Sequence, residues 1–205
     1  LWVRGPSFNK ERTWLEIAYE GTLSDPPPPA TGLKAFYRSG QVFLTWKEVK
    51  TPFAGRDEVR WKDLSAERKR IRRGAGEIVT YRIYRHTEPI TAGNLAEAEL
   101  IDEAGQHSAF DESEIKTVWK GERIKNVRVP EALVPRAYVE PEKMLPVGTG
   151  VWVRTCPENG RFHYAVVTAV NGRENTTALN AGNTAGPIAV KVAPTEPIFV
   201  LPGSR

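Results

Sequence analysis

The stretch Gln41–Val49 reads QVFLTWKEV and is the clearest strand in the chain. Its apolar side chains alternate, so Val42, Leu44 and Trp46 fall on one face with a period of two residues. Such a face is typical of a strand that is buried on one side against a second layer. The turn signal Ser39–Gly40 comes directly before this strand.

Six further runs have the same character, and turn residues separate most of them. These runs are residues 33–37, 78–85, 100–102, 150–155, 161–170 and 188–192. The 16 prolines and 17 glycines among 205 residues favour many short elements joined by turns. The sequence therefore predicts an all-β fold, an immunoglobulin-like β-sandwich of about seven strands.

Two long insertions interrupt this pattern of strands. Residues 51–76 hold a polar stretch, Lys62–Arg73, which is expected to form about three turns of helix. Residues 112–147 hold several prolines and are expected to be irregular. The sandwich is thus predicted over residues 31–193, with irregular or partly helical insertions between its strands.

The ends of the chain are expected to lie outside the sandwich. Residues 25–30 include four consecutive prolines and predict a stiff linker. Residues 1–24 are expected to be N-terminal strands or the tail of a preceding domain, and residues 194–205 an exit linker. No apolar run reaches the roughly 18 residues of a membrane span. The expected context is a larger secreted or cell-surface protein.

Three stretches carry a resemblance to a known family. Pro28–Trp46 resembles the proline-led first strand and the second strand of a fibronectin type III domain, and Tyr81–Arg85 resembles its third strand. Phe162–Asn175 resembles its sixth strand, in which Tyr164 would form the tyrosine corner. The likeness is to the divergent domains of bacterial modular proteins. The family's module has about 100 residues, so the two insertions are a departure from it.

A core follows from the resemblance and from the sizes of the side chains. Large aromatic residues on regular strands stabilise a fold most when they are buried. The expected core residues are Trp46, Tyr81, Ile83, Tyr164 and Val166.

Residue types that carry catalysis or bind metals are sparse. The three histidines are dispersed, and none lies in a nucleophile elbow or a His-Glu-x-x-His helix. A single cysteine, Cys156, cannot build a structural zinc site. No catalytic residue, metal or cofactor is therefore predicted for this chain. Asn175–Thr177 matches a glycosylation sequon.

Binding residues are sought in the insertions. Trp61 and Trp119 are flanked by charged residues, so they are candidate surface platforms for a sugar, although either could instead anchor its insertion. An exposed Trp61 would contribute much less stability than Trp46. The basic run Lys62–Arg73 is either a solvated helix face or a patch for an acidic partner. Sparse aromatic residues near it disfavour nucleic acid.

Three functions remain open from the sequence. The first is a non-catalytic structural or interaction module that spaces or packs against a neighbouring domain or subunit of the same protein. The second is a carbohydrate-binding accessory module of a polysaccharide-degrading enzyme or esterase. The third is a segment of a hydrolase whose catalytic residues lie outside this chain.

Overall fold

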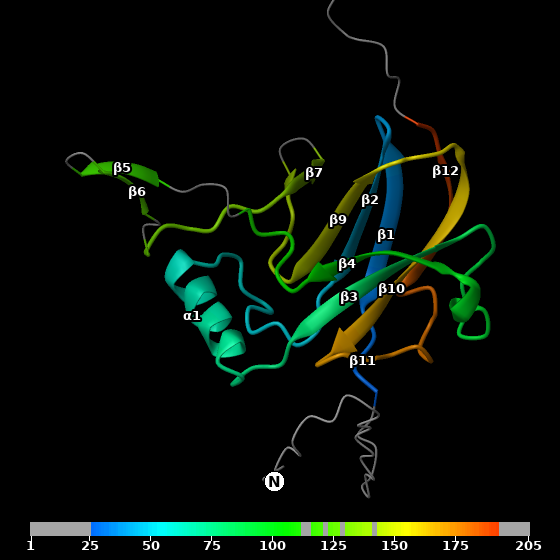
Figure 1. Cartoon of the computed structure of the whole chain (residues 1–205), viewed down its shortest axis with the longest axis horizontal. Coiled ribbons are helices and arrows are strands. Elements are labelled where there is room, and N and C mark those ends of the chain that lie inside the picture. Colours follow the sequence, from blue (N-terminus) through cyan, green and yellow to red (C-terminus); the bar gives the residue numbers. More distant parts are fainter. Residues whose placement is uncertain (1–25, 112–115, 121–122, 128–129, 141–142, 193–205) are drawn as a thin grey trace, which may run out of the picture.

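A computed structural model describes residues 26–111, 116–120, 123–127, 130–140 and 143–192. The predicted terminal segments 1–24 and 194–205 lie outside the described residues. The fold is mostly β with one short α-helix, and its antiparallel sheets do not close into a barrel (Figure 1). Among the described residues, no helix is long and apolar enough to cross a membrane.

The first large sheet has three strands in the order β1-β2-β9. They are β1 (Thr31–Arg38), β2 (Gln41–Lys47) and β9 (Thr149–Thr155). The central strand, β2, is the stretch that the alternation of Val42, Leu44 and Trp46 predicts. It pairs with β9 along its whole length, from Gln41 opposite Thr155 to Lys47 opposite Thr149.

The second large sheet has the order β11-β10-β3-β4, and β12 also pairs with β10. Its strands are β3 (Val79–His86), β4 (Glu99–Gly105), β10 (Gly160–Val170), β11 (Arg173–Glu174) and β12 (Thr184–Val190). A single 3₁₀ turn, η1 (Leu95–Glu97), lies between β3 and β4. The long strand β10 is thus central, which explains why so few of its residues are polar.

The two insertions contain regular structure of their own. The first holds helix α1 (Trp61–Arg72), which confirms the predicted three turns. The second holds two hairpins, formed by β5 (Lys116–Lys120) with β6 (Arg123–Val127) and by β7 (Tyr138–Glu140) with β8 (Lys143–Met144). The expectation of an irregular segment over 112–147 is wrong, because short runs such as Lys116–Lys120 are rich in residues that favour strands.

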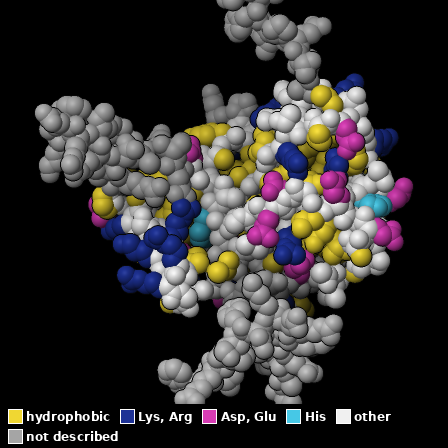
Figure 2. All heavy atoms as spheres, in the orientation of Figure 1, with side chains coloured by type: hydrophobic (Ala, Val, Ile, Leu, Met, Phe, Trp, Pro, Cys, Tyr) yellow, Lys and Arg dark blue, Asp and Glu magenta, His cyan; other side chains and the backbone are white. Residues whose placement is uncertain are grey.

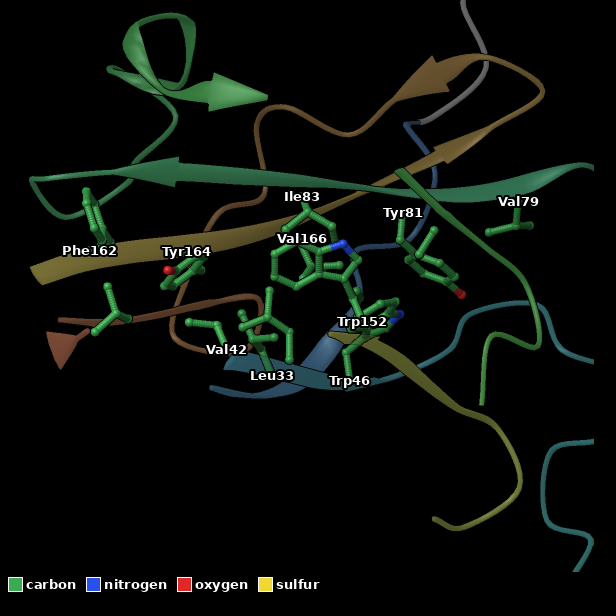
Figure 3. Close-up of a cluster of buried hydrophobic side chains, with 14 of the residues drawn as sticks. Leu33, Val42, Trp46, Val79, Tyr81, Ile83, Trp152, Phe162, Tyr164 and Val166 are labelled. Carbon is green, nitrogen blue, oxygen red and sulfur yellow. The ribbon is translucent and has the colours of Figure 1, made fainter. Parts of the chain in front are cut away.

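The main core lies between the two large sheets. In Figure 3, Trp46 and Trp152 of the first sheet point toward Tyr81 and Ile83 of the second. The five side chains that the sequence places in a core are all in this cluster, each at most 3% exposed. The rings of Trp46 and Tyr81 lie 5.1 Å apart and are tilted, a favourable geometry for an aromatic pair.

The expected tyrosine corner at Tyr164 does not have its hydrogen bond. The Tyr164 side chain is buried, but its hydroxyl makes no hydrogen bond with any residue that the structure describes. Burial raises the pKa of Tyr164 to about 12. It is the Tyr81 hydroxyl that accepts a hydrogen bond from a backbone group, the Val49 N–H, at 2.9 Å. Tyr81 therefore ties β3 to the chain segment that follows β2.

The proline-rich segment is attached to the second sheet over its described part. Pro27 and Ala30 are buried. The Ala30 N–H donates to the Thr168 hydroxyl at 2.8 Å, and the Asn175 side-chain amide donates to the Pro27 carbonyl at 2.6 Å. Residues 27–30 thus pack against the fold before β1 begins.

A second, smaller core joins the two insertions. Phe53, Val59, Trp61 and Leu64 come from the first insertion, and Val134 comes from the second. The backbones also pair, because the Trp61 N–H donates to the Ala132 carbonyl at 3.0 Å. We call the unit formed by residues 53–73 and 130–137 the appendage.

Of the two alternatives for Trp61, the exposed surface platform is wrong, and the ring instead anchors its insertion. Its side chain is only 3% exposed. Trp61 and Leu64 are three residues apart on α1, so they share the face that packs on the second insertion. The charged neighbour Lys62 points outward and is exposed. The flanking charges of Trp61 therefore mark the other face of the helix, not the environment of Trp61.

Truncating Trp61 is expected to be as costly as truncating Trp46. Each of Trp46→Ala and Trp61→Ala should lower the free energy of unfolding by about 3–5 kcal/mol, because both remove a buried aromatic side chain. Urea unfolding followed by circular dichroism measures the loss. Tyr138→Ala is the matched control, since that ring is 56% exposed. A Trp61→Ala protein as stable as the Tyr138→Ala protein would contradict the appendage core.

Candidate functional site

The junction between the appendage and the large sheets holds a buried polar pair. Glu48 follows β2, and His107 follows β4. Their side chains are 1% and 2% exposed, and the His107 Nδ1 lies 3.4 Å from the Glu48 Oε2. The other carboxylate oxygen, Oε1, accepts the His107 backbone N–H at 2.6 Å. A charged side chain is rarely buried so fully without a structural role.

Aromatic rings enclose the imidazole of His107. Its ring centroid lies 5.1 Å from that of Phe53 and 5.8 Å from that of Phe110. Phe53 belongs to the small core of the appendage, and Phe110 packs against that core. Because Glu48 continues directly from β2, the pair connects the first large sheet to both insertions. We infer that it holds the appendage in one orientation.

Glu67 of α1 is a second acidic group near this junction. It is 8% exposed, and both of its carboxylate oxygens accept hydrogen bonds from Arg70 at 2.7 and 2.8 Å. These bonds hold the pKa of Glu67 below its usual range, whereas burial opposes them. Glu67 therefore neutralises one cation of a helix that is otherwise strongly basic.

The helix α1 and the residue that follows it are strongly basic. Residues 61–73 contain six basic and two acidic side chains, a net charge of +4, which equals that of the whole chain. Lys69, Arg72 and Arg73 are exposed and form no ion pair with any residue that the structure describes. Figure 2 shows these basic side chains gathered over α1. We call Lys69, Arg72 and Arg73 the cationic face.

The dipole of the helix accounts for part of this clustering of basic residues. Basic side chains in the last turn interact favourably with the partial negative charge at the carboxyl end of a helix. That effect explains why such residues are tolerated close together. It leaves the exposed guanidinium and ammonium groups free to meet an anionic partner.

The remaining sequence candidates do not form a site. Trp119 belongs to β5, but its side chain lies outside the described residues. Asn175 is 3% exposed and its amide nitrogen is hydrogen-bonded to Pro27, so the sequon is inaccessible in the folded protein. Burial raises the pKa of Cys156, which is the direction opposite to that of a reactive thiolate.

The metal-ligating side chains of the described residues are dispersed. No group of three His, Cys, Asp or Glu side chains among these residues is placed to hold a metal ion. Asp102, in the acidic strand β4, accepts a hydrogen bond from the Trp152 indole at 2.9 Å. That bond lowers its pKa and gives the carboxylate a structural partner.

Comparison with protein-family models, with curated proteins and with solved structures finds no match for this chain.

Removing the Glu48 carboxylate is expected to destabilise the junction. Glu48→Ala leaves the buried backbone N–H of His107 without its acceptor, so the free energy of unfolding should fall by at least about 1–3 kcal/mol. Glu103→Ala is the control, because Glu103 is in an exposed ion pair with Arg82 and such pairs contribute about 0–1 kcal/mol. Urea unfolding measures both. Equal losses would show that the buried pair has no special role.

The stability contributed by Glu67 should depend on pH. Because folding lowers the pKa of Glu67 from 4.5, its contribution is present above that value and is lost as the pH falls through the folded-state pKa. Glu67→Gln should therefore destabilise the protein by about 1 kcal/mol at neutral pH and by less in acid. Urea unfolding at several pH values tests this. A difference that stays constant, or grows in acid, would contradict it.

Proposed function

We propose that this chain is a non-catalytic interaction module of a larger protein, which uses the cationic face of α1 to dock onto an acidic surface of a neighbouring domain or subunit. The appendage supplies a small folded base for this face. The large sheets supply the scaffold that holds the appendage.

The order of the strands supports a fibronectin type III-like sandwich as that scaffold. With the insertion hairpins and the short β11 set aside, the first, second and fifth strands form one sheet, and the third, fourth, sixth and seventh form the other. The immunoglobulin constant type instead places its fourth strand beside the fifth. Here β4 pairs with β3, which favours the fibronectin type III arrangement that the sequence resembles.

The unpaired charge on α1 is the observation that carries the proposal. Elsewhere on the surface, basic groups are commonly paired, as Arg82 is with Glu103 and Arg85 with Glu99. Three adjacent cations without partners repel one another and gain from an acidic surface, which also steers association. Trp61, the aromatic residue of α1, is buried at the other end of the helix, so α1 offers no exposed aromatic platform on which a sugar or a base could stack.

The other two functions have less support. A carbohydrate-binding role through Trp61 conflicts with the burial of that ring. The proposal of a hydrolase segment requires catalytic residues outside this chain. Sequencing the gene on either side of this segment would show whether a hydrolase domain is encoded there.

Zero-length crosslinking in the larger protein tests the docking. A carbodiimide joins a lysine amine directly to a carboxylate, so Lys69 should crosslink to an Asp or Glu of a neighbouring domain or subunit. Arg72→Glu/Arg73→Glu should lower the yield at least about tenfold, because like charges across an interface cost several kcal/mol. Mass spectrometry of the digested product identifies the crosslinked pair.

Arg161→Glu/Lys191→Glu is the matched control for charge, since these exposed side chains lie on β10 and directly after β12 rather than on α1. It should leave the yield at Lys69 unchanged. Crosslinks from Lys69 that stay within this module, or a yield that Arg72→Glu/Arg73→Glu does not change, would overturn the proposal.

A further inference from the structure

A groove of about 300 Å³ lies between the first large sheet and the β7–β8 hairpin. One wall is the outward face of β1 and β2, with Lys34, Phe36 and Lys47 among its residues. The other wall includes Val139 and Met144 of the hairpin. The second insertion thus builds a concave surface on the large sheet, at the lower end of the size range for ligand sites.

The floor of the groove is apolar and aromatic. The Phe36 ring is stacked on Phe43, with centroids 5.0 Å apart and planes 2° from parallel. Phe43, with Arg38 over its ring at 5.0 Å, lies beside the groove and holds the Phe36 ring in place. Met144 is 36% exposed. Methionine side chains adapt readily to the shape of an apolar partner.

The rim of the groove is cationic. Lys34 and Lys47 are exposed, and neither forms an ion pair with a residue in the described part of the chain. Lys34 lies opposite Thr45, so Lys47, two residues further along β2, is its diagonal neighbour on the same face. Of the other charged lining residues, Lys143 lies 3.7 Å from Glu140. The two sheet lysines therefore lack a counter-charge.

The spacing of these groups matches an extended peptide. Lys34 and Phe36 are two residues apart on β1, so they lie about 7 Å apart on one face. An extended peptide repeats its side chains on one face at the same interval. A carboxylate near Lys34 and Lys47 would then place an apolar side chain, two residues along, beside Phe36 and Met144.

We propose that this groove is a second binding site, and that it takes an extended peptide segment of a partner protein in which carboxylate and apolar side chains alternate on one face. The two lysines pair with the carboxylate, and the aromatic floor takes the apolar side chain. This site is separate from the cationic face of α1 and does not depend on the docking proposed for it.

Titration with synthetic peptides tests the site. The probe is a seven-residue peptide with Asp and Leu at alternate odd positions and Ser between them, capped at both ends and labelled with a fluorophore. Fluorescence anisotropy should show saturable binding with a dissociation constant below about 1 mM. Amide chemical shifts should change in β1, β2 and β7. A second peptide with Lys in place of each Asp should bind at least about tenfold more weakly.

Two variants assign the binding to the groove. Lys34→Glu/Lys47→Glu should weaken binding of the Asp peptide at least about tenfold, and Met144→Ala should weaken it with both lysines intact. Arg161→Glu/Lys191→Glu, which makes the same change of charge away from the groove, should leave the affinity unchanged. Circular dichroism melts establish that each variant is folded.

Three results would overturn the proposal. One is no binding of the Asp peptide by the unaltered protein. Another is equal affinity for the Asp and Lys peptides, or an affinity for the Asp peptide that Lys34→Glu/Lys47→Glu leaves unchanged. The third is binding of an oligogalacturonate that perturbs β1 and β2 while the Asp peptide does not, which would make the groove a site for an anionic sugar.

Discussion

The packing of Trp46 between the two large sheets is the contact on which the rest of the structure depends. The indole lies directly against Gly150 of β9, where a β-carbon would come within 2.4 Å of the ring, so only glycine fits there. On its other side the ring meets Tyr81, whose hydroxyl holds the Val49 N–H. One side chain thereby sets the spacing of β2, β9 and β3 at the point where both insertions connect to the sheets.

The insertions use that fixed point to fold on each other. Glu48 comes two residues after Trp46, and its backbone N–H donates to the Gly148 carbonyl at 2.8 Å, next to the start of β9. Its carboxylate then holds His107, around which the apolar rings of the appendage close. A chain of contacts therefore runs from the main core to α1. Two segments that would be unstable alone gain one small shared core.

This arrangement places two different surfaces on one scaffold. The first insertion presents cations on a helix, whereas the second raises a hairpin over an aromatic sheet face. Neither surface exists on the strands alone. The binding capacity that we propose for this protein therefore resides in the insertions and in how they meet the sheets, and the strands of the two large sheets hold them in place.

The sequence by itself determined the main strands of the two large sheets, the helix and the main core. Alternation is a local pattern, so Val42, Leu44 and Trp46 reveal a buried face without reference to any partner. The apolar spacing within Lys62–Arg73 likewise marks a helix. The hairpins of the second insertion were missed, since their strands have only two to five residues and show too little alternation to be recognised.

Only the tertiary structure decided how the insertions pack and which of their residues meet. Trp61 was expected at the surface because its neighbours in sequence are charged, yet it is buried by Val134, which is far away along the chain. The pairing of Glu48 with His107 and the meeting of Lys34 with Met144 in one groove also join residues from distant segments. No local pattern encodes such contacts, because they arise only when the two sheets bring the ends of both insertions together.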